Sequence, residues 1–164
     1  MRAYVAVGTN LGDRWSHLAS AARHLRQAPG VALVRASRVY DTEPVGPPQP
    51  RYLNAVLELE TSRPPASLHE VLVRAELAAG RRRLSELRWG ARPLDLDLLL
   101  QGDLVVRTRT LTLPHAALGR RRFVLVPLAD LVPGLSVPGL GSTVAELLAA
   151  APPLGLRPVG LYPL

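Results

Sequence analysis

The run Leu94-Asp95-Leu96-Asp97-Leu98-Leu99-Leu100 constrains the fold most, because it sets two carboxylates into an otherwise apolar stretch. Its period of two predicts a strand with Asp95 and Asp97 on one face and leucines on the other. The carboxylates then lie side by side, roughly 6–7 Å apart at Cα. Like charges this close are unfavourable on a half-buried sheet unless a cation lies between them. The apolar end of the run favours a central strand, while an edge strand with a solvated polar face is the plain alternative.

The rest of the chain shows the periodic patterns of further strands and of helices. Period-two stretches predict strands, and helical periodicity predicts two helices, the second with an apolar stripe through Leu68, Leu72, Ala75 and Leu77 and a cap at Gly80. The expected strands are 2–8, 31–40, 52–61 and 94–101, and the expected helices are 14–27 and 65–79. The order is βαββαβ, typical of a ferredoxin-like antiparallel sheet with helices packed on one face.

Beyond this core, the pattern predicts extra C-terminal elements. We expect a short extended piece at 104–106, a loop at 112–115, a helical turn at 123–130, a helix at 143–150 and an extended segment at 157–162. The predicted fold class is therefore α+β, in one domain that spans residues 1–164.

The composition excludes several chemistries. The chain has no cysteine, so disulfides, thiolate metal sites and a cysteine nucleophile are excluded. All twenty basic residues are arginine, which excludes a P-loop, a protein-kinase site and a Schiff-base lysine. Any phosphate must be held by arginine, backbone or metal. With a strand at the N-terminus and no long apolar run, we expect a cytoplasmic protein.

Arginines gather on both sides of the aspartate strand. Residues 81–88 form a basic loop that leads into Arg92 and the strand, and His115 precedes Arg120, Arg121 and Arg122. A solvated basic loop and a surface histidine are the plain interpretations. The position beside two strand carboxylates favours a polyphosphate bound with Mg²⁺, which prefers oxygen ligands.

A planar ring is the second expected ligand. Phe123 is the only phenylalanine, and Tyr52 shares a strand face with Asn54. The aromatic rings suit stacking, and an asparagine amide offers a donor and an acceptor to a heterocycle. Core packing is the plain alternative for Phe123. The turn Gly8-Thr9-Asn10-Leu11-Gly12 is interpreted as a tight connection from strand to helix.

Together these motifs resemble the 6-hydroxymethyl-7,8-dihydropterin pyrophosphokinase family over nearly the whole chain. The segments that carry the resemblance are 8–12, 40–46, 52–56, 88–100, 113–115 and 121–125. The resemblance implies transfer of the β,γ-pyrophosphoryl group of ATP to the hydroxymethyl oxygen of the pterin, giving AMP and the pterin diphosphate in folate biosynthesis. It also implies a ferredoxin-like fold with added elements.

The resemblance further implies the role of each site residue. It assigns two Mg²⁺ ions to Asp95 and Asp97, and catalysis to Arg81, Arg83, Arg92, Asp95 and Asp97. It assigns ATP binding to Glu76, Arg81, Arg83, Trp89, Arg92, Leu98, Thr112, His115 and Arg121. It assigns pterin binding to Thr42, Val45, Tyr52, Asn54, Trp89 and Phe123. Arg81 and Arg83 are expected on a mobile loop that Trp89 closes over the site, in a monomer that binds neither nucleic acid nor membrane.

Two other functions fit parts of the sequence. A ferredoxin-like palm or cyclase domain also presents strand carboxylates to two metal ions and a nucleotide, but it generally releases pyrophosphate. An RNA-recognition sheet would use arginines and stacked aromatics, but the aromatic and glycine motif expected on its central strands is missing. Without a metal, Asp95 and Asp97 would also repel the phosphates of a bound RNA.

Overall fold

The computed structural model describes residues 1–82 and 90–164. Its core elements follow the predicted order, and three of the expected strands and both helices match closely in position. The core elements are β1 (Arg2–Thr9), α1 (Arg14–Gln27), β2 (Val31–Ala36), β3 (Arg38–Thr42), β4 (Tyr52–Thr61), α2 (Pro65–Ala78) and β5 (Asp95–Gln101). The added elements are β6 (Val106–Arg107), β7 (Thr112–Leu113), η1 (Leu118–Arg120), α3 (Arg122–Leu131), α4 (Val144–Ala150) and β8 (Leu156–Leu161).

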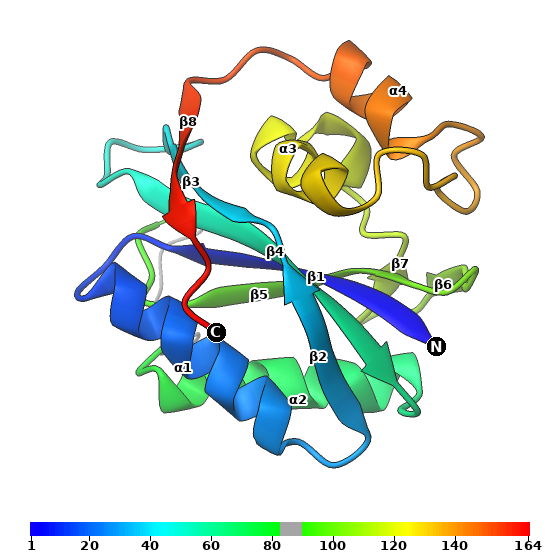
Figure 1. The fold of residues 1–164 in the computed structure, drawn as a ribbon, viewed down its shortest axis with the longest axis horizontal. Coiled ribbons are helices and arrows are strands. Elements are labelled where there is room, and N and C mark those ends of the chain that lie inside the picture. Colours follow the sequence, from blue (N-terminus) through cyan, green and yellow to red (C-terminus); the bar gives the residue numbers. More distant parts are fainter. Residues whose placement is uncertain (83–89) are drawn as a thin grey trace.

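The main sheet has six strands and is antiparallel at every recorded pairing. Its strand order is β5-β1-β4-β3-β8, and β2 also pairs with β4. This is the ferredoxin-like arrangement that the element order predicted, with β8 added at one edge. Figure 1 shows α1 and α2 on one side of this sheet and α3 and α4 on the other.

Side-chain alternation sends the strands' apolar residues to two separate cores. One core lies between the sheet and helices α1 and α2, and it includes Val5, Val7, Leu57 and Leu96. The other lies under α3 and α4 and includes Val56. Because neighbouring residues of a strand face opposite ways, Asp95 and Asp97 share the α3 side of the sheet, while the alternating leucines on the other face fill the first core. The predicted polar and apolar faces of this strand are confirmed.

The prediction that β5 is a central strand is wrong, because β5 forms the edge of the sheet beside β1. Its outer edge is nevertheless covered. The backbone N–H of Leu96 donates to the Glu76 carboxylate at 2.8 Å, and the Leu99 carbonyl accepts from His115 N at 2.9 Å. These contacts satisfy backbone groups that an edge strand otherwise leaves exposed, so the apolar run can be buried without a second strand neighbour.

The strand expected over residues 31–40 is two strands, β2 and β3, separated at Ser37. The Ser37 hydroxyl accepts from Val56 N at 2.9 Å and donates to the Arg38 carbonyl at 2.7 Å. The side chain thereby takes over backbone pairing at the break. This interruption depends on a contact with β4, so periodicity within the segment does not reveal it.

Helix α3 is longer than the helical turn expected at 123–130. Its buried residues, Val124, Leu125, Leu128 and Leu131, recur at helical spacing and pack on the sheet. Pro127 lies inside the helix and argues against it on propensity alone. Burial against the sheet therefore determines this helix. By contrast Leu77, expected in the apolar stripe of α2, is 53% exposed.

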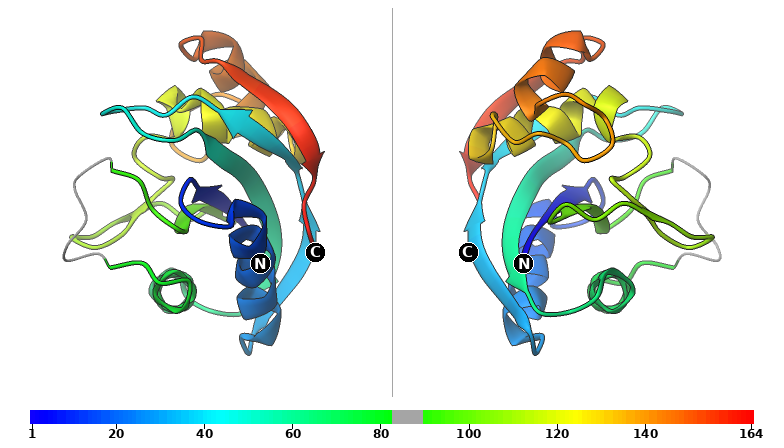
Figure 2. Two further views of the ribbon diagram at one scale, coloured as in Figure 1. Left: turned by 90° about the vertical axis from the view of Figure 1, so that its left-hand side faces the viewer. Right: turned by 90° about the vertical axis from the view of Figure 1, so that its right-hand side faces the viewer.

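Figure 2 shows the small β6–β7 hairpin projecting from the body of the molecule on the β5 side. The loop expected at 112–115 supplies β7, and Val106 pairs with Leu113 across the hairpin. Within the described residues, no helix combines the length and apolar character needed to cross a membrane.

Candidate active site

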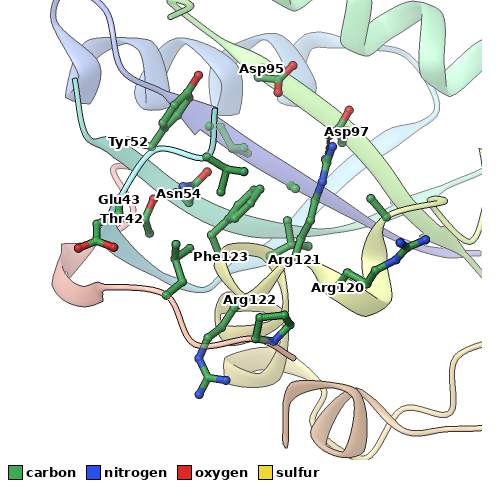
Figure 3. Close-up of a pocket in the computed structure, with 18 of the residues that line it drawn as sticks. Thr42, Glu43, Tyr52, Asn54, Asp95, Asp97, Arg120, Arg121, Arg122 and Phe123 are labelled. Carbon is green, nitrogen blue, oxygen red and sulfur yellow. Dashed lines mark hydrogen bonds and ion pairs between the residues drawn. The ribbon is translucent and has the colours of Figure 1, made fainter. Parts of the chain in front are cut away.

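A cavity of about 860 Å³ opens on the α3 side of the sheet. It draws residues from strands β1, β3, β4 and β5, the segment after β3, η1 and the residues before it, the start of α3, and the segment before β8. The lining residues are Ala6, Val7, Gly8, Thr42, Glu43, Val45, Tyr52, Asn54, Arg92, Asp95, Asp97, Ala116, Ala117, Arg120, Arg121, Arg122, Phe123, Val124, Pro152, Pro153 and Leu154. Figure 3 shows the two aspartates at one end, Thr42 and Asn54 at the other, and Phe123 between them.

Small residues of β1 form the floor between the two ends. Gly8 pairs with Asn54 on one side and with Asp95 on the other, and Ala6 pairs with Asp97. A Cβ on Gly8 would lie 2.9 Å from Asn54 Oδ1, which is too close without a shift. Glycine at this position therefore leaves room for the asparagine side chain, and the antiparallel register fixes the spacing of Asn54 and the aspartates.

Each aspartate has its own arginine partners. Asp95 Oδ1 lies 2.5 Å from Arg81 Nη1 and 3.3 Å from Arg92 Nη1. Asp97 Oδ2 lies 3.1 Å from Arg121 Nη1, the interaction drawn in Figure 3, and 3.7 Å from His115 Nε2. About a third of the Asp97 side chain is exposed, so its carboxylate stays accessible from the cavity.

The negative charges of Asp95 and Asp97 repel one another. Loss of hydration and then the neighbouring Asp95 charge raise the pKa of Asp97, against the smaller effects of His115 and Arg121. Burial likewise lowers the pKa of His115, outweighing its attraction to Asp97. A neutral imidazole gives Asp97 little charge compensation, so Arg121 is its charged partner at this end of the cavity.

The donor set at this end fits Mg²⁺ bound jointly with a substrate. Within residues 1–82 and 90–164, no group of three or more His, Cys, Asp or Glu side chains could hold a metal on its own. Mg²⁺ commonly takes only one or two protein carboxylates and completes its shell with water and phosphate oxygens. Two accessible aspartates beside Arg92 and Arg121 match that mode of binding.

The other end of the cavity suits a flat polar ring. The Asn54 amide donates to Thr42 Oγ1 at 2.6 Å, and both residues are buried. That bond turns Asn54 Oδ1 into an available acceptor beside Gly8. The Tyr52 hydroxyl donates to the Gly90 carbonyl at 3.2 Å, and burial raises the pKa of Tyr52, so the phenol stays neutral.

Phe123 and Arg121 join the two ends. Arg121 precedes α3 and Phe123 lies in its first turn, with the guanidinium carbon 5.8 Å from the ring centre. Arg122 has a different orientation: its Nη1 donates to the carbonyls of Leu148 and Ala151, at 3.3 and 3.2 Å, and Figure 3 shows its side chain directed away from the aspartates. Arg121 thus faces the aspartates, at what we call the acidic end of the cavity, while Arg122 binds carbonyls at the end of α4.

Several predicted site residues lie away from the cavity surface. Glu76 is fully buried, and Leu98 is buried in the core under α1 and α2. Thr112 lies in β7, and His115 reaches Asp97 without lining the cavity. Arg81, expected on a mobile loop, is only 8% exposed and is held in ion pairs. The predictions for Arg83 and Trp89 fall outside the described residues.

Asn10 is a site-supporting residue that the sequence interpretation missed. It is 2% exposed, and its Oδ1 accepts from Arg92 N at 2.8 Å. Its Nδ2 donates to Gln49 Oε1 at 3.0 Å and to the Pro50 carbonyl at 2.9 Å. The side chain therefore ties the segment before β5 to the loop before β4. An asparagine between two glycines was the available signal in the sequence, but its partners are 39 to 82 residues away.

Comparisons with known proteins place the sequence among pterin pyrophosphokinases. The sequence model of 7,8-dihydro-6-hydroxymethylpterin-pyrophosphokinase (HPPK) matches residues 4–133. The chain is 42% identical over 157 residues to a 2-amino-4-hydroxy-6-hydroxymethyldihydropteridine pyrophosphokinase of Pseudomonas aeruginosa, covering 95% of each chain. It is 42% identical to the enzyme of the same name from Methylorubrum extorquens, over 96% of this chain and 98% of that one.

Solved structures support the fold independently. A Plasmodium falciparum HPPK-DHPS structure matches 91% of this chain with a TM-score of 0.65 at 15% identity. An HPPK-DHPS crystallised with substrates matches 91% with a TM-score of 0.69 at 11% identity. This chain spans only 43% of each of those longer proteins. At such low identity, these matches bear on the fold alone.

Proposed function

The chain belongs to the 7,8-dihydro-6-hydroxymethylpterin-pyrophosphokinase family, and from that premise we propose how its residues divide the work of the reaction. The enzyme is a pyrophosphokinase of folate biosynthesis, with ATP and the hydroxymethyldihydropterin as substrates. The reaction joins the pterin hydroxymethyl oxygen to Pβ of ATP and breaks the bond from Pβ to the oxygen it shares with Pα. AMP and the pterin diphosphate are the products.

Asp95 and Asp97 would hold two Mg²⁺ ions together with the triphosphate. When bound, the metal neutralises phosphate charge and makes Pβ more susceptible to attack. The support is the raised pKa of Asp97, the accessible carboxylates and their placement on one strand face. The protein's own contribution is to keep both carboxylates fixed beside the cavity floor, so that binding requires little rearrangement.

Arg92 and Arg121 would bind the phosphates from opposite sides of the aspartates. Each now pairs with one aspartate, and each lines the cavity. A guanidinium offers several donors in a fixed plane and keeps its charge at any relevant pH, which suits a polyphosphate. Because pyrophosphoryl transfer is catalysed mainly by alignment and charge neutralisation, these two residues would have the largest effect on turnover. Arg81, Arg83 and His115 remain proposed phosphate ligands, and Trp89 a proposed closing residue.

Tyr52 and Phe123 would enclose the pterin ring, and Asn54 would recognise its polar edge. The support is the Thr42 bond that directs the Asn54 amide, together with the position of Phe123 between this end and the aspartates. Backbone groups at Thr42 and Val45 would complete the recognition. A pterin held here presents its substituent toward the acidic end, across the small side chains of β1.

The observation that carries these assignments is that one cavity joins a carboxylate pair with arginines to an asparagine flanked by aromatic rings. A palm or cyclase domain on the same sheet would share the first group but has no need for the second. We also propose that one domain, as a cytoplasmic monomer, performs the reaction without nucleic acid or membrane; sedimentation velocity at working concentration tests the monomer.

The test is to incubate the protein with ATP, Mg²⁺ and 6-hydroxymethyl-7,8-dihydropterin and to follow products by phosphorus NMR. AMP formed only with pterin present is the expected result, and the omission of Mg²⁺ should stop it. Release of pyrophosphate or ADP would instead support another nucleotide enzyme on this sheet. Full turnover in EDTA would contradict the metal assignment.

A further inference from the structure

Glu76 is an unusual carboxylate, because it lies beside the acidic end of the cavity yet is fully buried. A buried charge is costly unless it is paired and hydrogen-bonded. Glu76 Oε1 accepts from Arg81 Nη1 at 2.6 Å and from Leu96 N at 2.8 Å. Its complete burial does not suit direct contact with ATP, which the resemblance implied for it.

The end of α2 brings Arg81 back onto Glu76. Gly80 follows the helix with φ of +89°, a conformation that glycine adopts readily. The N–H of Gly80 donates to the Leu77 carbonyl at 3.0 Å and the N–H of Arg81 donates to the Glu76 carbonyl at 3.1 Å. This pair of bonds is the Schellman ending of a helix. Arg81 is therefore bound to Glu76 through both its backbone and its side chain.

The same guanidinium nitrogen also contacts β5, the strand that carries Asp95 and Asp97. Arg81 Nη1 lies 2.5 Å from Asp95 Oδ1, so one charged nitrogen bridges Glu76 and Asp95. Leu96 N, the second donor to Glu76, lies between Asp95 and Asp97 on the outer edge of β5. Glu76 thus holds both the arginine partner of Asp95 and the backbone that sets the direction of the two aspartates.

We propose that Glu76 is a positioning residue that acts through Arg81 and the Leu96 N–H to hold Asp95 in its working orientation. This inference rests on the proposed roles of Arg81 and Asp95 in the reaction. The competing explanation is a purely structural ion pair, which stabilises the fold without affecting the chemical step. The two explanations differ in kinetics, because a small misplacement of a catalytic group lowers the rate strongly, by up to about 100-fold.

The chain contains a matched control. Glu58 is 5% exposed and pairs with Arg35 Nε at 2.6 Å, the same separation as the Glu76–Arg81 pair. It also pairs with Arg2 at 3.2 Å, and it does not line the cavity. Glu58→Gln therefore removes a similarly buried carboxylate from an ion pair of the same length, although Arg35 is more exposed than Arg81, and it does so away from the proposed site.

The experiment compares Glu76→Gln with Glu58→Gln, at a temperature where circular dichroism shows both to be folded. Glutamine keeps an acceptor for Leu96 N–H and loses the charge that holds Arg81. We expect the single-turnover rate of Glu76→Gln to fall roughly 10- to 100-fold with KM values changed less than about twofold, while Glu58→Gln keeps the wild-type rate. Glu76→Asp, which keeps the charge, should recover part of the rate.

A double-variant cycle separates the inference from the proposed role of Arg81. If Arg81→Ala lowers the rate and adding Glu76→Gln lowers it little further, Glu76 acts through Arg81. If Arg81→Ala and Glu76→Gln each lower the rate and their factors multiply in the double variant, the positioning role is overturned. Equal rates for Glu76→Gln and Glu58→Gln would overturn it as well. An unchanged rate in Arg81→Ala would instead refute the proposed role of Arg81.

Hydrogen exchange in the ligand-free protein gives a readout independent of turnover. Exchange at the Leu96 amide should be slow in the wild type and faster in Glu76→Ala, which removes the acceptor, relative to amides elsewhere in β5. Equal protection of this amide in both proteins would contradict the proposed hold of Glu76 on this part of the strand.

Discussion

Replacing Thr42 with valine should weaken pterin binding without filling or opening the cavity. Thr42 is 1% exposed, and its Oγ1 is 2.6 Å from Asn54 Nδ2. Valine has nearly the same shape but cannot accept this hydrogen bond. The Asn54 amide then loses the contact that directs its Oδ1 toward the space beside Gly8.

The size of the effect follows from the burial of the pair. A buried donor left without its partner costs about 1–3 kcal/mol, and Asn54 is only 7% exposed, so water compensates little. If the amide turns toward another partner, most of this free energy is lost from pterin binding. A loss of about 1.4 kcal/mol corresponds to a tenfold higher dissociation constant, and we expect a tenfold to about hundredfold increase.

Titration calorimetry with 6-hydroxymethylpterin, Mg²⁺ and a non-hydrolysable ATP analogue measures the change. Thr42→Ser is the control, since it keeps the hydroxyl and should bind within about threefold of wild type. Asn54→Ala sets the scale for complete loss of the amide. Wild-type affinity in Thr42→Val, alongside weak binding by Asn54→Ala, would refute the orienting role of Thr42. Equal weakening in the serine and valine variants would attribute the effect to methyl packing instead.

Four shorter predictions concern the rest of the site and the fold. Asp97→Ala should abolish transfer and leave the circular dichroism spectrum unchanged; turnover retained with Mg²⁺ would contradict its metal role. Arg92→Ala should lower kcat about 100-fold and change the pterin dissociation constant much less, and unchanged steady-state kinetics would remove it from catalysis. Phe123→Ala should raise the pterin dissociation constant about tenfold or more, whereas an unchanged calorimetric value would make it a packing residue only. Burial and the bond to Asp130 raise the pKa of Tyr40 to about 12, so its contribution to stability is complete below pH 10 and declines toward pH 12; urea unfolding should show a smaller alkaline loss in Tyr40→Phe.

The sequence predicted the fold class because its strongest signals are local. Period-two alternation identified β1, β4 and β5, helical periodicity identified α1 and α2, and their order limited the topology to a ferredoxin-like sheet. The same alternation correctly placed Asp95 and Asp97 together, and Tyr52 and Asn54 together. Local geometry is sufficient for these conclusions, since neighbours on one strand face are fixed by the backbone itself.

Long-range contacts decided what alternation left open. Whether β5 is central or at the edge depends on its neighbours in space, and Glu76 and His115 cover the edge from other parts of the chain. The division between β2 and β3 depends on Ser37 meeting Val56 of β4. The length of α3 depends on burial against the sheet, which outweighs the helix-breaking tendency of Pro127.

The site shows the same division at the scale of single side chains. The amino-acid sequence by itself determined which chemical groups the enzyme has: a carboxylate pair, arginines without lysine, and few aromatic rings. Only the tertiary structure decided their partners. It buried Arg81 between Glu76 and Asp95, turned Arg122 toward α4, and joined Asn10 to Arg92 across 82 residues. Side-chain pairing depends on distances in the folded chain, and spacing along the sequence does not specify those distances.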